Sequence, residues 1–358
     1  MADVQVKTPG KLYIAGEYAV VEPGYSAIVA SVNSFIHLFL QEAKTNFGTI
    51  YSKGFTHEPV SFIRENDQIL LDHSKEELQY VKSAIEVTEE YLKEKGISLT
   101  YYTIQIHSEL INETGRKLGL GSSGAVTVAV VQALLKFYKV DFSDLIVYKL
   151  SVLAQLRLGI NSSYGDLASI AYTGWIKYTS PDREAVKAYQ NKHSIKETVE
   201  WTWPYLAIEP LKISKDLYFL IGWTGSPASS DELVGSVQKN KSQSLKQYQD
   251  FLHTSQQAVD SLTTALQTLN RNQLIQSIEM NRLALKEMGK QTGVLIETEQ
   301  LSQLCEIAQA HGGAAKTSGA GGGDSGIAFI FEEEKVEAIV TDWEKAGITN
   351  LPLEIYSK

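Results

Sequence analysis

Alternation of apolar and polar positions predicts strands near the start of the chain. The stretches concerned are KLYIAGEYAVV (11–21), SAIVASVNSFIHLFL (26–40) and TIQIHSEL (103–110). Successive side chains of a strand point to opposite faces, so an apolar residue at every second position indicates one face packed on a core. The first third of the chain is therefore expected to build a sheet.

Apolar residues spaced three or four apart predict helices between and after these strands. Residues 79–96 have this spacing, with charged partners and a closing glycine, and predict a surface helix. The run AVTVAVVQALLKFY (125–138) is long enough for a buried helix despite its valines, and a further helix is expected over 143–158.

The second half of the chain repeats this mixture in another order. A strand, LYFLIGWTG, is followed by long helices over 230–311, and two strand candidates, GIAFIF and LPLEIY, flank a helix at 333–347. Between about 180 and 210 the chain becomes polar, which is typical of a domain boundary. We therefore predict an α+β protein with domains at 1–195 and 196–358.

Composition narrows the class of protein. The chain has 358 residues, is 43% hydrophobic and carries a net charge of -9, which argues against binding to nucleic acid or to an anionic membrane surface. The single cysteine, Cys305, allows no intrachain disulfide, and no run approaches the length of a membrane span. A cytoplasmic protein is expected, as a monomer or homodimer.

The stretch GLGSSGAV (119–126) raises the question of a phosphate site. Its glycines spell G-x-G-x-x-G, but no strand runs directly into the first of them and no acidic residue closes a second strand, so the context excludes a dinucleotide fold. A glycine-rich turn that enters a helix still offers unpaired N–H groups and a positive dipole to phosphate. The alternative is a tight loop in which Ser122 or Ser123 caps the helix.

Two further stretches share this character. KTPGKLYIAGEYAVV (7–21) places Lys11 on a strand behind a Pro-Gly turn, and KTSGAGGGDSG (316–326) is a second glycine-rich loop. Each has an ordinary explanation, as an exposed strand lysine or a loop of close backbone approach. Their combination in this order favours one shared site.

These motifs resemble those of the GHMP small-molecule kinases, over nearly the whole chain. The resemblance implies a ribosomal S5-like N-terminal domain that binds the nucleotide, a ferredoxin-like C-terminal domain, and an active site in the cleft between them. The implied co-substrate is ATP with Mg²⁺. Neither a P-loop G-x-x-x-x-G-K-[ST] nor the motifs of protein kinases occur in the sequence.

Within the family the chain looks most like the bacterial phosphomevalonate kinases. The segments that carry this likeness are GRKLGLGSSGAV, SSYGDLASIAYTGW and GWTGSPASSDELV. Arg116 and Lys117 stand where several members have a proline and small residues, and extra cations suit an acceptor that already bears a phosphate. The implied reaction converts (R)-5-phosphomevalonate and ATP to (R)-5-diphosphomevalonate and ADP, a step of isoprenoid biosynthesis.

The resemblance also implies roles for individual residues. Lys11, Lys117 and Asp166 would be the catalytic residues, and Ser123 would reach the metal. The nucleotide phosphates would be held by the middle motif, Gly119, Leu120, Gly121, Ser122, Ser123 and Gly124. The acceptor would be bound by Arg116, Ser163, Gly165, Gly225, Ser226, Ser229, Arg282, Ser318 and Gly319.

Several alternatives stay open at this stage. Asp166 could instead be a helix N-cap, and Arg282 a solvated helix residue. Gln155 stands where mevalonate kinases carry a glutamate that binds Mg²⁺, and an amide is the weaker ligand. The protein could also be another GHMP kinase, such as a mevalonate kinase, or a non-catalytic ligand-binding member of the fold.

The chemistry of a phosphate acceptor suggests a further hypothesis about Asp166. A phosphate monoester has a second pKa of about 6 and is largely dianionic at pH 7, so it needs no strong base to become a nucleophile. Asp166 would then mainly orient Lys11 and balance its charge.

Overall fold

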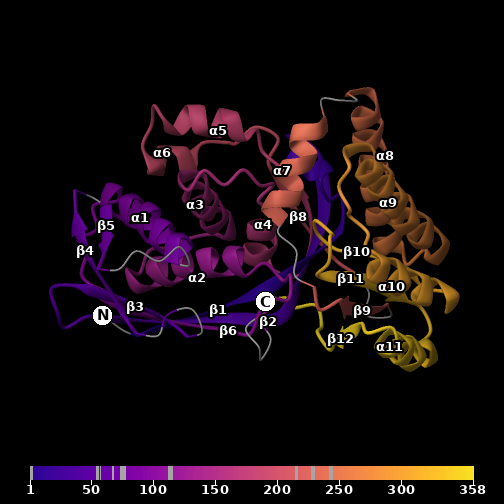
Figure 1. Cartoon of the computed structure of the whole chain (residues 1–358). Helices are drawn as coiled ribbons and strands as arrows, with labels where there is room; N and C mark the ends of the chain where they lie inside the picture. Colours follow the sequence, from indigo (N-terminus) through magenta and orange to yellow (C-terminus); the bar gives the residue numbers. More distant parts are fainter. Residues whose placement is uncertain are drawn as a thin grey trace.

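The computed structural model describes residues 3–358 except 54–55, 57, 67, 73–77, 112–115, 214–216, 227–229 and 242–244, and omits the side chains of Ser230 and Asp231. Figure 1 shows two halves, each built on its own sheet, with the N-terminal half coloured indigo to magenta and the C-terminal half orange to yellow. No helix of the described part combines the length and apolar character needed to cross a bilayer.

The first sheet comprises eight strands within the described residues, in the order β5-β4-β3-β6-β2-β7-β8, with β1 paired to β2. They are β1 (Val4–Ala15), β2 (Ser26–Glu42), β3 (Gly48–Ser52), β4 (Val60–Glu65), β5 (Gln68–Leu71), β6 (Tyr102–Ser108), β7 (Trp175–Thr179) and β8 (Ala207–Leu211). β2 is antiparallel to β1, β6 and β7, and its length lets it hold the two parts of the sheet together.

Helices cover one face of this sheet (Figure 1). They are α1 (Gln79–Glu94), α2 (Ser122–Phe137), α3 (Asp144–Arg157) and α4 (Gly165–Tyr172), followed by α5 (Arg183–Gln190) and α6 (Ile195–Glu200). α2 contacts β1, β2, α1, α3 and α4, so it is the central helix of this half. Burial on nearly all sides overrides the strand preference of its valines.

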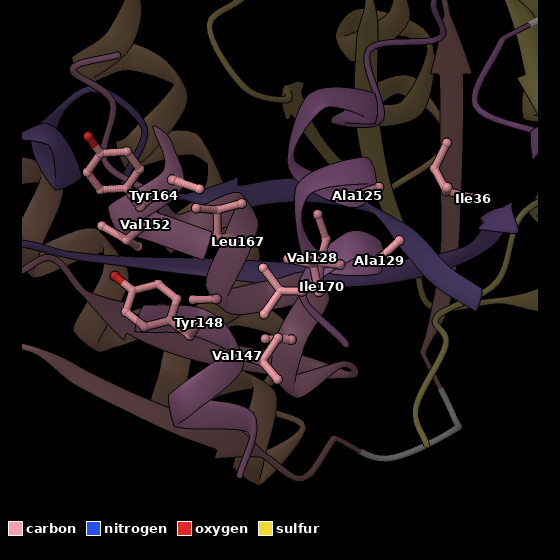
Figure 2. Packing of buried hydrophobic residues seen from close by; sticks show 14 of the residues in the cluster. Ile36, Ala125, Val128, Ala129, Val147, Tyr148, Val152, Tyr164, Leu167 and Ile170 are labelled. Carbon is pink, nitrogen blue, oxygen red and sulfur yellow. The ribbon is translucent and has the colours of Figure 1, made fainter. Parts of the chain in front are cut away.

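Figure 2 shows how α2, α3 and α4 meet in the core. Val128 of α2, Val147 of α3 and Ile170 of α4 are all fully buried in one cluster. Because these helices carry the loops around residues 119–124 and 159–166, their packing fixes where those loops lie.

The second sheet is antiparallel, with the order β10-β11-β9-β12. Its strands are β9 (Tyr218–Trp223), β10 (Ala314–Thr317), β11 (Ser325–Ile330) and β12 (Thr349–Leu351). The accompanying helices are α7 (Ser230–Asn240), α8 (Leu245–Thr268), α9 (Arg271–Thr292), α10 (Glu299–Ala310) and α11 (Val336–Lys345), and short 3-10 turns lie at η1 (Ala19–Val21) and η4 (Glu333–Lys335).

The α+β class and most predicted elements are confirmed, with corrections at two predicted strands. The strand predicted over 11–21 ends at Ala15, and residues 19–21 form the 3-10 turn η1 instead. The last predicted strand, LPLEIY (351–356), is wrong, because β12 runs from Thr349 to Leu351 and overlaps it only at Leu351, while Ile355 forms an isolated bridge to Val32. The polar segment after residue 180 contains α5, α6 and β8. The division at residue 195 stays a prediction, and the pairing of β8 with β7 favours a boundary after Leu211.

Candidate active site

A cavity of about 720 Å³ collects the three motifs singled out from the sequence. Lys11 and Tyr13 of β1 line it, together with residues 117 and 119–123 and with Gly319, Ala320 and Asp324. Backbone and side-chain contacts hold the motifs in place. Lys11 N donates to Leu120 O at 2.9 Å, and Ser325 Oγ donates to Leu118 O at 3.2 Å. The expected convergence of the motifs on one site is therefore present in the fold.

Lys11 lines this cavity from β1. A register shift between Pro9 and Gly10 interrupts the pairing of β1 with β2 just before it. Its Nζ donates to Gly119 O at 3.3 Å, which places the ammonium beside the middle motif. Burial lowers the pKa of Lys11, while the nearby carboxylates of Asp166, Asp324 and Glu17 oppose that shift. The ammonium is thus surrounded by negative charge from three different segments.

The middle motif forms the entrance to α2 in the way that an anion site requires. Gly119 has a φ of 75°, and a Cβ at this position would lie 2.8 Å from the Asp324 side chain. Gly121 is the N-cap residue, in the left-handed conformation and without a side-chain cap hydrogen bond. The alternative in which a serine caps the helix is therefore wrong. Ser122 and Ser123 both line the cavity at the first turn of α2.

Asp166 reaches the cavity from the first turn of α4. The N-cap of this helix is Tyr164, so the alternative of Asp166 as N-cap is also wrong. A Cβ at Gly124 would lie 2.6 Å from Asp166 Oδ2, which shows how closely the two helices approach. The carboxylate therefore lies against the start of α2 and acts electrostatically on Lys11.

Ser163 lies beside Asp166 on the same wall of the cavity. Tyr13 Oη and Ser163 Oγ are 2.8 Å apart, and Tyr178 Oη donates to Ser163 O at 2.5 Å. Burial raises the pKa of Tyr13 well above its usual value, so this phenol stays protonated. Gly165 lies behind the pair, because a Cβ there would lie 2.6 Å from Tyr13 Oη.

Some of the remaining predicted residues line the cavity, and others contact the backbone around it. Gly319 and Lys117 line the cavity, whereas Ser318 donates from Oγ to Tyr13 O at 2.8 Å. Ser226 follows β9, and its carbonyl accepts from Asp324 N at 2.7 Å. Gly225 precedes it with a φ of 77°.

Like Gly165, Gly225, Ser226 and Ser318, the two predicted arginines are not among the described lining residues of the cavity, and Ser229 cannot be placed. Arg116 is exposed and is not among the described residues of the lining. Ser229 lies outside the described residues. Arg282 is buried on α9, where its guanidinium makes a bidentate contact with Glu297 at 2.8 Å and a bond to Gln309 at 3.1 Å. It is neither a solvated helix arginine nor a lining residue.

Several lining residues were not anticipated. Glu17 and Asp324 lie within the recognised motifs, and their charge was a signal that the sequence offered. Gln155 lines the cavity at the position already noted as an amide in place of a carboxylate. On the opposite wall, α7 contributes Val234, Gly235 and Gln238.

α7 is attached to the first half of the chain through one carboxylate. Glu22 Oε1 accepts from Gln238 Nε2 at 3.1 Å, from Lys241 Nζ at 2.6 Å and from Tyr248 Oη at 2.9 Å. These donors hold the pKa of Glu22 below its usual value despite partial burial. Elements of both halves therefore enclose the cavity.

Comparison with known proteins gives a consistent picture. Residues 79–174 match the model of the GHMP kinases N terminal domain, and residues 265–349 match the GHMP kinases C terminal model. A phosphomevalonate kinase of Streptomyces sp. (strain CL190) is 36% identical, over 96% of this chain and 95% of its own. A mevalonate kinase of Thermococcus gammatolerans is 27% identical, over 98% of this chain and 96% of its own.

Solved structures agree with these relatives. The phosphomevalonate kinase of Streptococcus pneumoniae in complex with phosphomevalonate and AMPPNP superimposes with a TM-score of 0.87. It is 31% identical and covers 99% of this chain and 100% of its own. The Lin0012 protein of Listeria innocua is 40% identical with a TM-score of 0.93, over 99% of this chain and 98% of its own. The resemblance and the two-domain fold that it implied are confirmed: the chain belongs to the GHMP kinase family.

Proposed function

We propose that the protein is a cytoplasmic kinase that transfers the γ-phosphoryl group of ATP to the phosphate of (R)-5-phosphomevalonate, giving (R)-5-diphosphomevalonate and ADP. The observation that carries the proposal is the placement of Lys11 and Asp166 in one cavity with the N-terminus of α2. The Streptomyces and Streptococcus pneumoniae relatives, at 36% and 31% identity, are phosphomevalonate kinases, and this supports the choice of acceptor.

The start of α2 would hold the nucleotide phosphates. The first turn of a helix presents unpaired N–H groups and the positive end of the dipole, both of which stabilise phosphate oxygens. The absence of a Cβ at Gly119 lets the Asp324 side chain lie against the backbone of the motif, because a Cβ there would lie 2.8 Å from that side chain. Lys117 at the cavity edge would add one cation to the triphosphate.

Lys11 would stabilise the transferring phosphoryl group. Phosphoryl transfer asks a protein mainly to position the reactants and to balance charge. Asp166 would orient Lys11 from the α4 side, as its electrostatic effect on the lysine indicates. Because the acceptor phosphate is already largely ionised at pH 7, Asp166 need not remove a proton.

The lining residues fit Mg²⁺ that arrives with the nucleotide. Hard oxygen donors are present in Ser123 and the carboxylates around Lys11, and Gln155 supplies an amide oxygen. Among the described residues no group of three or more His, Cys, Asp or Glu is arranged to hold a metal. Ser123 would therefore be the main protein ligand, and the ion would supply neutralisation of phosphate charge.

The acceptor would bind on the wall formed by Ser163 and Gly319. Arg116 is exposed outside the described lining but adjoins Lys117, which lines the cavity, so it would attract the acceptor phosphate at longer range. Ser226 and Ser318 would shape this wall through their contacts with Asp324 and with Tyr13, and Gly225 through its turn conformation, rather than by touching the acceptor.

The test is ADP release with Mg-ATP and a panel of acceptors, namely 5-phosphomevalonate, mevalonate, homoserine, galactose and none. We expect turnover with 5-phosphomevalonate alone. A preference for mevalonate would support kinase activity but contradict the assignment of 5-phosphomevalonate as the acceptor. Absence of turnover with every acceptor would contradict the proposed enzymatic activity and favour a ligand-binding protein.

A further inference from the structure

A fully buried lysine lies next to a residue that lines the catalytic cavity. Lys316, on β10, has a fully buried side chain, and its Nζ is 2.5 Å from Glu17 Oε1. Glu17 follows β1, and only 2% of its side chain is exposed. The other described contact of the ammonium is Thr317 O at 2.6 Å. An ion pair this deep is costly to break from one side, because the remaining charge is left buried and uncompensated.

Two neighbouring contacts fix the geometry of this pair. Ser318 Oγ donates to Tyr13 O at 2.8 Å, and Tyr18 Oη donates to Ala320 O at 2.6 Å. With the ion pair, they join the segment after Lys11 to the start of the third glycine-rich loop. Lys316 and Glu17 are therefore held close to each other in the folded protein.

Glu17 also faces the catalytic cavity. It is one of the lining residues, and its charge acts on the ammonium of Lys11. Its second oxygen, Oε2, is buried and has no hydrogen-bond partner among the described residues. A carboxylate in such a place would attract Lys11 and repel phosphate groups unless another charge offset it.

We infer that Lys316 is a positioning residue for the phosphoryl-transfer site: by pairing with Glu17 it neutralises a carboxylate that would otherwise compete for Lys11 and repel the anionic substrates. The inference rests on the proposed function, because it takes the cavity to hold a nucleotide. Lys316 itself does not line the cavity in the described structure, so it acts through Glu17.

A double-mutant cycle separates this role from simple support of the fold. The variants are Lys316→Gln, Glu17→Gln and the double variant, which has a neutral amide pair. The readouts are the Kd of Mg-ADP by isothermal titration calorimetry and the melting temperature. We expect Lys316→Gln to weaken Mg-ADP binding by about tenfold, since it leaves Glu17 uncompensated beside phosphate.

The diagnostic result is rescue by the second substitution. The double variant should bind Mg-ADP within about threefold of the original protein, whatever its loss of melting temperature. A double variant that binds Mg-ADP as weakly as Lys316→Gln would overturn the inference, because the inference attributes the weak binding to the uncompensated charge of Glu17, which the double variant lacks. Should Lys316→Gln fail to fold, Glu17→Gln decides alone: unchanged or tighter binding supports the inference and weaker binding contradicts it.

The control is Lys286→Gln, which removes a lysine from another buried carboxylate. Lys286 Nζ is 3.0 Å from Glu297 Oε1, and neither residue is among the described lining residues. Its Mg-ADP affinity should not change. The cycle reads nucleotide binding and not turnover, so it stays informative even if the acceptor panel shows that 5-phosphomevalonate is not the substrate.

Discussion

The two glycine-rich loops of the cavity have similar compositions and different tasks. The loop before α2 ends in a helix N-terminus, which offers N–H donors to an anion. The loop between β10 and β11 leads into a strand and not into a helix. Its backbone packs against other segments of the protein, and it carries Asp324 to the cavity. A Cβ at Gly321 would lie 2.1 Å from Ile296 O, whereas one at Gly119 would meet only the side chain of Asp324. A glycine-rich loop therefore indicates that other atoms approach its backbone closely. The element that follows the loop decides whether the loop serves anion binding or packing.

Removal of the ammonium that lies between the two loops should have the largest effect. Lys11→Met is expected to lower kcat by about 10³-fold or more, because charge on the transferring group loses its closest protein cation. The melting temperature should change little. Steady-state kinetics with Mg-ATP and 5-phosphomevalonate measure the change in kcat.

The matched control for this variant is Lys7→Met on the same strand. Lys7 is exposed, with its Nζ 4.6 Å from the centre of the Phe35 ring, and is not among the described lining residues. A kcat loss of equal size in both variants would show that the strand, and not the Lys11 ammonium, is what matters.

Alanine substitutions compare the loops directly. Gly321→Ala should reduce the free energy of unfolding by at least about 2 kcal/mol, because its new Cβ meets a backbone carbonyl at a φ of 71°. Gly119→Ala should cost less stability, since the Asp324 side chain can move. Its Mg-ADP affinity should fall more than that of Gly321→Ala. Urea unfolding and calorimetry give both quantities, and the reverse order would remove the distinction between the loops.

The carboxylates around Lys11 should influence how kcat depends on pH. Lys11 works as a cation, so activity should fall as pH rises through its pKa, which burial places below the usual value. Asp166→Asn and Asp324→Asn each remove a negative charge that raises this pKa, so the basic limb of kcat should move to lower pH. The shift should be larger for Asp166, whose effect on Lys11 is the greater.

The acidic limb of the same profile tests the role of Asp166. If Asp166 only orients Lys11, the Asp166→Asn variant should lose about tenfold in kcat, less than is typical for loss of a general base, and keep an acidic limb set by the substrate phosphate. Loss of that limb would contradict the role. Asp260→Asn, at an exposed pair with Lys177, should leave the profile unchanged.

The smallest effect is expected at the edge of the first loop. Arg116→Gln should raise the KM for 5-phosphomevalonate by about fivefold, with kcat and the KM for ATP nearly unchanged, because an exposed cation contributes little. Arg157→Gln, which removes an exposed ion pair with Glu90, should alter no constant. Equal changes in both KM values would place Arg116 on the nucleotide instead.

The sequence predicted those parts of the site that local patterns encode. A glycine turn before an apolar run indicated the start of α2, and the neighbouring motifs supplied Lys11 and Asp166. The pair of Glu17 with Lys316 joins residues 299 positions apart, and no local pattern carries such a contact. The same is true of the approach of α7 to Glu22. The ion pair of Arg282 was missed because its spacing alone did not show that α9 buries this side.

Some errors could have been avoided. Helix α6 begins with a capping box between Ser194 and Glu197, a signal that the sequence contains in SIKE. Asp182 caps α5 in the same region. The polar composition of this segment outweighed both signals, although a short helix that buries little, such as α5 with Val186, is expected to be polar.

The most direct test of the account is the phosphorus NMR spectrum of the product formed from 5-phosphomevalonate and Mg-ATP. The account predicts two coupled diphosphate signals in addition to those of ADP, because the acceptor atom is a phosphate oxygen. A second monoester signal would mean that a hydroxyl group was phosphorylated, and inorganic phosphate alone would mean hydrolysis of ATP. Either result would contradict the proposed use of this cavity.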